Sequence, residues 1–187
     1  MLVQQAILKI EQVISIENCK KMISYMDIHC KTKATVVGKG NKGVTDTKTR
    51  DVLSHWLNPD DYGAPEYFQI VEQAIRKGII EYSKQIKFLG RLQLNEINLL
   101  KYEKGNFYIK HVDQSSSLNR TLSIIINLNE EYDGGDVVFT NPITDKPYSK
   151  PDLKAGDIIL FPSNFLYPHQ VTPLKKGVRY SIVSWLS

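Results

Sequence analysis

Hydrophobic positions repeat with a helical period in the first half of the chain. After Ser15, apolar residues recur every three or four positions to Met26, which predicts a helix capped by the Ser15 hydroxyl. A second helix is expected to begin at Pro65 and to end near residue 86. Its apolar stripe consists of Phe68, Val71, Ile75, Ile79 and Ile86. Gly78 costs this helix about 1 kcal/mol relative to alanine, so we expect its C-terminal end to be looser.

The pattern between these helices is irregular. Residues 32–50 are rich in Gly, Lys and Thr, and we expect a short strand, a mobile loop and a second strand that carries Arg50. The Gly- and Lys-rich loop near residues 38–49 is a candidate lid over a substrate. It is not a phosphate loop, because no helix with a Lys-Ser/Thr start follows it. Residues 51–65 contain turn residues around Trp56, which we expect to be an anchor.

From about residue 90 the hydrophobic period changes to two. Short apolar runs alternate with Gly, Pro, Asn and Asp, as is typical of β-strands and their turns. Seven or eight such runs predict a mainly β fold of the α+β class, with a jelly-roll (double-stranded β-helix) core and the helices packed outside. We expect a single domain over residues 1–187, in which residues 1–89 support a catalytic core at 90–187.

Composition narrows the class of protein without selecting a function. The 187 residues include 42% hydrophobic and 24% charged residues, and the net charge is +4. The lysines are spread along the chain, so charge gives no reason to expect a nucleic-acid partner. Cys19 and Cys30 are too few for a disulfide framework, and we expect reduced thiols and a cytoplasmic location. We expect neither a signal peptide nor a membrane span, since polar residues interrupt the apolar N-terminal positions.

His111 and Asp113 are the first candidates for chemistry. They lie two apart on a predicted strand, so both side chains can face the same barrel mouth. A jelly roll can bring the distant His169 to the same point. Two imidazoles and one carboxylate on one face of an octahedron are typical of non-haem Fe(II) oxygenases, and zinc is the rival metal. The His-x-Asp pair alone is weak evidence, because such residues are common at strand ends.

Arg179 adds a second feature to this pattern. It follows His169 by ten positions within an apolar strand and lies on the same strand face as Ser181. A buried arginine needs an anion to offset the loss of its hydration, and its fork of donors suits a carboxylate. A dicarboxylate that binds the metal through its other end would supply that anion.

With these residues in place, the sequence resembles the 2-oxoglutarate/Fe(II)-dependent dioxygenases, in particular their prolyl 4-hydroxylase-like branch. The resemblance covers roughly residues 90–187. It is carried by the segments "YEKGNFYIKHVD", "EEYDGGDVVF" and "KAGDIILFPSNFLYPHQVTPLKKGVRYSIVSW". One departure is that the strand "LSIIINLN" lacks a tyrosine that helps to bind the distal carboxylate in some relatives.

The resemblance implies a role for nine residues. It implies that the catalytic metal ligands for Fe(II) are His111, Asp113 and His169. Arg179, helped by Ser181, would bind the distal carboxylate of 2-oxoglutarate, with Tyr102 and Tyr108 in the same cosubstrate pocket. Arg50 would bind the backbone of an extended peptide, and Trp185 would pack beside the site.

The implied reaction uses Fe(II), 2-oxoglutarate and O₂, with ascorbate as reductant. It would hydroxylate a C–H bond, of a prolyl residue in a peptide or protein, and release succinate and CO₂. Hydroxylation of a free amino acid or another small molecule stays open. So do a zinc hydrolase or cupin-type enzyme with the same ligands, and a non-catalytic jelly-roll binding module.

Overall fold

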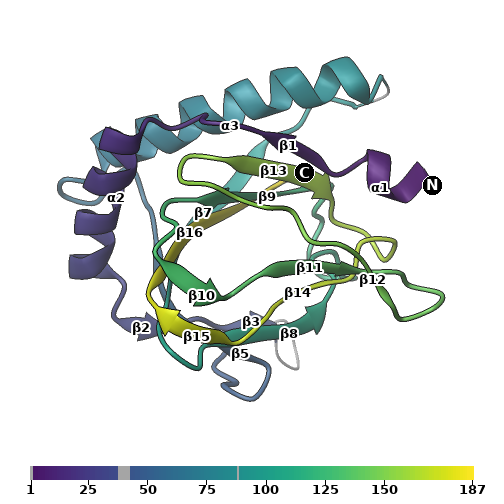
Figure 1. Ribbon diagram of the computed structural model, residues 1–187. Helices are drawn as coiled ribbons and strands as arrows, with labels where there is room; N and C mark the ends of the chain where they lie inside the picture. Colours follow the sequence, from purple (N-terminus) through teal and green to yellow (C-terminus); the bar gives the residue numbers. More distant parts are fainter. Residues whose placement is uncertain (1, 38–42, 88) are drawn as a thin grey trace.

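Two β-sheets face each other and the helices lie outside them (Figure 1). The computed structural model describes residues 2–37, 43–87 and 89–187. Helix α3 (Pro65–Gln85) crosses the outer face of the larger sheet, and α2 (Ile16–His29) packs beside it. A short helix α1 (Leu2–Gln5) precedes them. The predicted jelly-roll core with external helices is confirmed.

The larger sheet forms the back of the barrel and carries the helices. Its strand order is β1-β13-β9-β16-β7-β6-β2, and the pairs are antiparallel. In that order the strands are Leu8–Ile10, Ile158–Pro162, Leu122–Asn127, Arg179–Leu186, Leu94–Tyr102, Leu53–Trp56 and Thr32–Lys33. All six residues of β9 are buried, because helices cover one of its faces and the second sheet covers the other.

The smaller sheet closes the barrel opposite the larger one. Its order is β12-β11-β14-β8-β5, formed by Pro147–Ser149, Val137–Thr140, His169–Val171, Phe107–His111 and Arg50–Asp51. Two further sheets have two short strands each. One pairs β10 (Tyr132–Gly134) with β15 (Leu174–Gly177), and the other pairs β3 (Val36–Val37) with β4 (Gly43–Val44). The strand at Arg50 was predicted, whereas β1, β10 and β15 were not, and β6 occupies a segment in which we expected turns.

Both long helices begin as their sequences predict. The Ser15 hydroxyl accepts a hydrogen bond from the Asn18 amide at 3.2 Å, which caps α2. Pro65 occupies the first turn of α3, where its missing N–H leaves no helical bond unmade. Val71 and Ile75 of the predicted stripe are buried in the core.

Gly78 was predicted only to weaken helix α3, but in the structure it packs closely against strand β13. It is buried, and a Cβ built there would lie 3.1 Å from Ile158 Cδ1 and 3.2 Å from Leu160 Cδ1 of β13. The glycine therefore lets α3 approach the sheet closely, a packing role that helix propensity alone does not indicate.

The anchoring role expected for Trp56 is wrong. The residue ends strand β6, which pairs with β7, and its side chain is 60% exposed. Buried positions on either side of it, Val52 and Leu57, attach this segment to the core instead. The candidate lid lies partly outside the described residues, at 38–42. No helix within the described ranges is long and apolar enough to cross a membrane.

Candidate metal centre

Two histidines and an aspartate meet where β8 ends and β14 begins. His111 and His169 are direct cross-strand partners in the smaller sheet, and Asp113 follows β8 by two residues. One potential ligand atom from each residue lies within 4.8 Å of the others. His111 Nε2 is 3.4 Å from Asp113 Oδ1, and His169 Nε2 is 3.6 Å from Asp113 Oδ2. The structure thus brings together the three residues predicted to bind a metal.

Backbone carbonyls orient both imidazoles. His111 Nδ1 lies 2.8 Å from the Ile109 carbonyl oxygen, and His169 Nδ1 lies 3.1 Å from that of Tyr167. A carbonyl can only accept, so each Nδ1 carries a proton and each Nε2 faces the Asp113 carboxylate, where a metal would bind. The Tyr108 ring stacks on His111 with 3.6 Å between ring centroids, which further limits rotation of that imidazole.

Two serine hydroxyl groups hold Asp113 in place. The sequence did not indicate them as part of the site. Ser123 Oγ donates to Asp113 Oδ2 at 2.6 Å, and Ser163 Oγ lies 2.8 Å from Ser123 Oγ. Arg120 Nη1 donates to the Asp113 carbonyl oxygen at 3.4 Å. Ser123 and Ser163 are buried strand and turn residues whose spacing to Asp113 gives no signal along the chain.

The electrostatics of this group favour a bound cation. Burial, reinforced by His111, lowers the pKa of His169 to about 4, so its imidazole is neutral at physiological pH. Burial would raise the pKa of Asp113, but the two imidazoles and the Ser123 hydroxyl hold it below its usual range. Two imidazoles and one carboxylate are the donor set that suits Fe(II), so these residues fit that metal.

Arg179 lies fully inside the barrel, only 1% exposed, at the start of β16. Its Nη1 donates to Ser181 Oγ at 3.1 Å, and its guanidinium carbon lies 5.2 Å from the centre of the Tyr102 ring. Within the described part of the chain, Arg179 has no carboxylate partner and its Nε has no hydrogen-bond acceptor. A buried cation without an anionic partner is suited to bind the carboxylate of a ligand such as 2-oxoglutarate.

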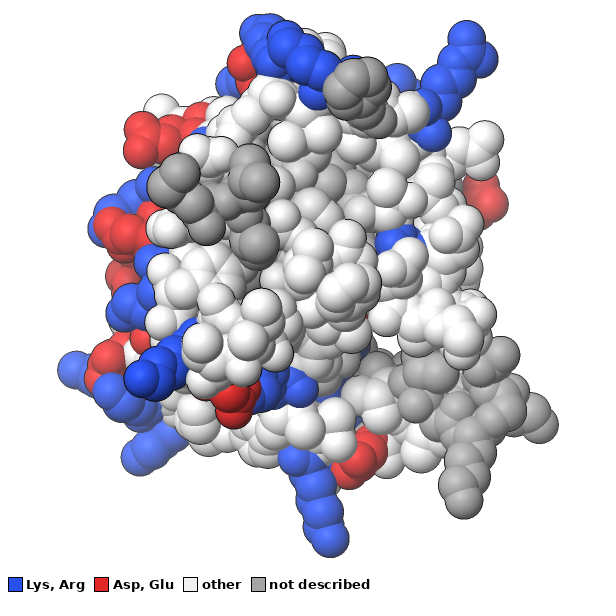
Figure 2. Space-filling view, turned by 90° about the vertical axis from the view of Figure 1, so that its right-hand side faces the viewer, with Lys and Arg blue, Asp and Glu red and all other residues white. Residues whose placement is uncertain are grey.

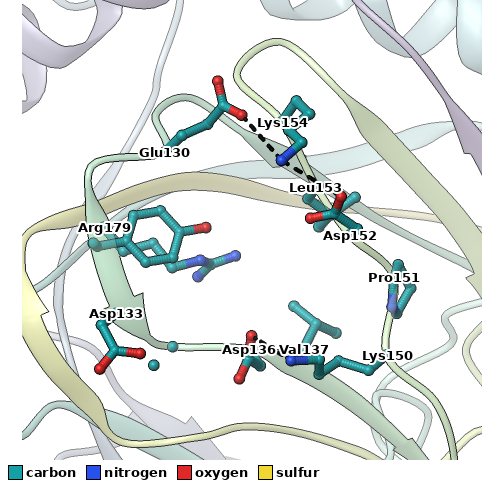
Figure 3. A pocket seen from close by; sticks show the side chains of 13 residues that line it. Glu130, Asp133, Asp136, Val137, Lys150, Pro151, Asp152, Leu153, Lys154 and Arg179 are labelled. Atoms are coloured by element: carbon teal, nitrogen blue, oxygen red, sulfur yellow. Dashed lines mark hydrogen bonds and ion pairs between the residues drawn. The ribbon is translucent and has the colours of Figure 1, made fainter.

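A pocket of about 380 Å³ opens beside Arg179 (Figure 3). The guanidinium extends into the space between the labelled β10–β11 residues and the segment 150–154. Four acidic side chains lie around this space, and Lys150, Lys154 and Lys175 pair with them. These acidic residues are Glu130, Asp133, Asp136 and Asp152.

On the metal side, a groove of about 340 Å³ runs past Asp113. Arg50 lies 4.8 Å above the Tyr108 ring, and its Nη1 donates to the Thr35 carbonyl. Arg120 stacks on Trp185 at 3.5 Å and pairs with Glu96 at 2.6 Å. Arg120 was not among the predicted site residues.

A small pocket of about 30 Å³ adjoins the groove and reaches the metal ligands. Its lining includes the predicted residues Arg50, Tyr102, Tyr108, His111, Asp113, His169 and Trp185. Apolar side chains such as Leu100 and Val171 form much of the rest. Seven of the nine predicted residues therefore line one pocket, and Arg179 with Ser181 lies behind Tyr102.

The face that carries this opening is mostly uncharged. Figure 2 shows the side of the molecule on which β8 ends, with uncharged side chains and a hollow at its centre and many charges near its edges. Val112 follows β8 directly, Phe165 and Leu166 precede β14, and all three are exposed. Such a surface suits a partner that is itself weakly charged.

Comparisons with known proteins agree with this geometry. The family model described as the 2OG-Fe(II) oxygenase superfamily matches residues 97–187. A PKHD-type hydroxylase of Prochlorococcus marinus (strain MIT 9515) is 31% identical over 153 residues, which are 80% of this chain and 64% of the relative. One from Synechococcus sp. (strain JA-2-3B'a(2-13)) is 32% identical over 93 residues, 46% of this chain and 39% of the relative. The chain thus spans about two fifths of the length of the latter relative.

Solved structures share the whole fold. A Trichoplax adhaerens prolyl hydroxylase, in complex with a peptide of the hypoxia inducible factor oxygen degradation domain, has a TM-score of 0.77 and 19% identity. The match covers 99% of this chain and 84% of that one. A Pseudomonas putida prolyl-4-hydroxylase has a TM-score of 0.70 and 17% identity, over 97% of this chain and 91% of that one. At these identities the likeness establishes the double-stranded β-helix fold.

Proposed function

We propose that this chain, whose residues 97–187 match the model of the 2OG-Fe(II) oxygenase superfamily, is a 2-oxoglutarate- and Fe(II)-dependent dioxygenase that hydroxylates a prolyl residue in a peptide or protein. One observation carries the proposal. His111, Asp113 and His169 form a compact donor set, and behind Tyr102 lies Arg179, a buried cation without a carboxylate partner in the described chain. A metal and a dicarboxylate would satisfy both groups.

In this proposal His111, Asp113 and His169 would hold Fe(II), and the small pocket that they line lies on the side where 2-oxoglutarate and O₂ would bind. The bound iron and 2-oxoglutarate supply the oxidising chemistry, in which 2-oxoglutarate and O₂ yield succinate, CO₂ and a hydroxylated substrate. The carbonyls of Ile109 and Tyr167 keep both Nε2 atoms directed at the metal position. The protein thereby fixes the ligand geometry before the metal arrives.

Arg179 binds the distal carboxylate of 2-oxoglutarate, and the Ser181 hydroxyl holds one of its Nη atoms. Tyr102 and Tyr108 line the small pocket that reaches the three proposed ligands, and the Tyr102 ring also lies against the Arg179 guanidinium. Apolar neighbours such as Leu100 and Val171 keep water away from the reacting groups. Ascorbate is the proposed reductant that keeps the iron in its Fe(II) state.

The groove on the metal side is the proposed substrate site. Arg50 lines this groove beside the Tyr108 ring, and its guanidinium is the proposed donor to a peptide carbonyl. Trp185, stacked on Arg120, offers a flat apolar wall next to the small pocket. The hydroxylase names of the relatives and the peptide bound to the Trichoplax protein support a peptide substrate. A cytoplasmic location stays part of the proposal, supported by two unpaired, buried cysteines.

The decisive experiment measures succinate formation from 2-oxoglutarate with Fe(II) and ascorbate. Proline-containing peptides are compared with the same peptides carrying alanine in place of proline. We expect stimulation by the first set only, and its loss in Asp113→Ala, which removes the anionic ligand. Asp60→Ala, at an exposed carboxylate far from the ligands in sequence, should behave as the parent protein.

The other outcomes separate the competing functions. Turnover of 2-oxoglutarate that no peptide stimulates would redirect the search to free amino acids and small molecules. Absence of turnover in a protein that binds Zn(II) tightly would favour a zinc enzyme. Full activity of Asp113→Ala would overturn the ligand assignment.

A further inference from the structure

A buried amide and a tyrosine lie close to Arg179. Asn127 ends strand β9 and is fully buried, and its backbone is paired with that of Ser181 on β16. The Tyr132 hydroxyl, from strand β10, donates to Asn127 Oδ1 at 3.2 Å. The amide is fixed in orientation, because its Nδ2 donates to the carbonyls of Asn129 and Leu153. Asn127 therefore holds the Tyr132 hydroxyl inside the barrel.

Tyr132 and Arg179 are also neighbours through Gly135. Both side chains line the pocket shown in Figure 3. Gly135 has a φ of +64°, and a Cβ built on it would lie 3.0 Å from Arg179 Cδ and 3.9 Å from Tyr132 Cε2. Any larger residue would push the arginine stem away, so the glycine lets the two side chains approach the same space.

The charges around this space favour an anion next to Arg179. Glu130 and Asp152 both pair with Lys154, at 3.5 Å and 3.4 Å, and Asp136 pairs with Lys150 at 3.3 Å. These carboxylates therefore have cationic partners of their own, whereas the arginine has no carboxylate partner within the described ranges. Tyr132 lines the same pocket as Arg179, and the present acceptor of its hydroxyl is the neutral amide of Asn127. A charged acceptor forms the stronger hydrogen bond, so the hydroxyl would turn to it.

We propose that the Tyr132 hydroxyl is a second donor to the distal carboxylate of 2-oxoglutarate, beside the guanidinium of Arg179. Asn127 keeps the hydroxyl in position while the site is empty of cosubstrate. The inference rests on the proposed function, because it requires 2-oxoglutarate as the ligand. The hydroxyl donor to the distal carboxylate would thus come from strand β10. Strand β9 cannot supply it, because residues 122–127 contain no tyrosine.

Calorimetric titration of the Mn(II)-loaded protein tests this assignment without turnover. The probes are 2-oxoglutarate and 2-oxopentanoate, which has the same 2-oxo acid end but a methyl group in place of the distal carboxylate. Tyr132→Phe should weaken 2-oxoglutarate binding about tenfold, the usual effect of losing a hydrogen bond to a charged group. It should leave 2-oxopentanoate binding unchanged, which also verifies that the variant is folded and its metal site intact.

Tyr180→Phe is the matched control. Tyr180 follows Arg179 on β16 but faces the opposite side, where its hydroxyl donates to Asp27 of α2 at 2.7 Å. This variant should bind both probes as the parent does. Unchanged 2-oxoglutarate affinity in Tyr132→Phe would overturn the proposal, and equal weakening of both probes would reduce Tyr132 to a packing residue. A parent protein that binds neither probe would refute the proposed function itself, and the role of Tyr132 with it.

Discussion

Single hydroxyl groups decide how well Asp113 is placed. The carboxylate has one strong hydrogen bond, from Ser123 at 2.6 Å, and that hydroxyl is itself contacted by Ser163. Both serines are buried, so water cannot replace the bond easily. The orientation of the proposed metal ligand therefore depends on a residue that never touches the metal.

Ser123→Ala tests this dependence. Removing the hydroxyl leaves Asp113 Oδ2 without its donor, and we expect Mn(II) affinity to fall at least tenfold, as for other residues that orient metal ligands. Titration of the metal-free protein with Mn(II) measures the effect. Ser184→Ala is the control, since Ser184 is equally buried but donates to the Glu96 carbonyl. An equal loss in both variants would point to general loosening of the barrel.

Arg120 is expected to act on the substrate. Its guanidinium lies 3.5 Å from the Trp185 ring and pairs with Glu96, which makes one wall of the groove. Arg120→Ala should raise the KM for a stimulating peptide about tenfold, because a buried cation–π contact and an ion pair are both lost. The affinity for 2-oxoglutarate should stay as in the parent. Arg76→Ala, at an exposed helical pair with Glu72, should change neither quantity.

Among the elements, α3 depends on a close contact with the sheet. A side chain at Gly78 would enter the space held by Ile158 and Leu160. Gly78→Val should lower the free energy of unfolding by about 2 kcal/mol through overpacking, although helix propensity alone favours most residues over glycine. Urea denaturation measures this change. Lys77→Val, at the exposed neighbouring position, should cost well under about 1 kcal/mol. Similar costs at the two positions would remove the packing explanation.

Helix α2 is attached to the sheet by Asp27. Its Oδ1 accepts from Tyr180 of β16 and from Lys101 of β7, both at 2.7 Å. Partial burial would raise the pKa of Asp27, but these two partners lower it below its ordinary value. Since the folded pKa is depressed, the stabilisation is present above about pH 4, the unfolded value, and is lost as pH falls through the folded pKa.

Asp27→Asn should therefore destabilise the protein by about 1 kcal/mol at pH 7, a modest value because half of the side chain is exposed. The difference from the parent should shrink when urea denaturation is repeated near pH 3. Asp60→Asn, at an exposed position, is the control and should show no such difference. A constant difference at both pH values would show that the carboxylate charge is not responsible.

The sequence predicted the longer elements because each has a clear hydrophobic period. The stripe of α3 and the apolar runs of β9, β13 and β16 are examples. Strand β1 and strand β10 have three residues each, too few for a period, so they were missed. Trp56 was misjudged because an aromatic residue among turn residues looks buried, and its exposure depends on where strand β6 lies in the sheet.

The candidate site was predictable where spacing along one strand fixes direction, as for His111 with Asp113 and Arg179 with Ser181. Residues that reach the site from other elements gave no such signal. Ser123, Arg120 and Tyr132 are examples, since their contacts arise only when the two sheets face each other.

For the molecule as a whole, ligand binding is expected to add stability. The three proposed metal ligands come from two strands and the loop that follows one of them, so the unfolded chain has no comparable site. Mn(II) at a hundred times its dissociation constant should add about 2.7 kcal/mol, which raises the melting temperature by about 5–10 °C. Differential scanning fluorimetry with and without EDTA measures the shift.

2-Oxoglutarate should add a second increment to the metal-loaded protein. Arg179→Ala should lose this second increment and keep the first, whereas Asp113→Ala should lose both. A second increment that survives Arg179→Ala would mean that the distal carboxylate binds elsewhere.

The direct pairing of His111 with His169 has a consequence for biosynthesis. A ribosome releases His111 and Asp113 well before His169, with strands β9 to β13 made in between. A half-made chain can therefore offer a metal only two of the three ligands, and the cell's more abundant divalent ions gain little hold on it. If the three residues bind a metal as proposed, the complete donor set exists only once the barrel has closed.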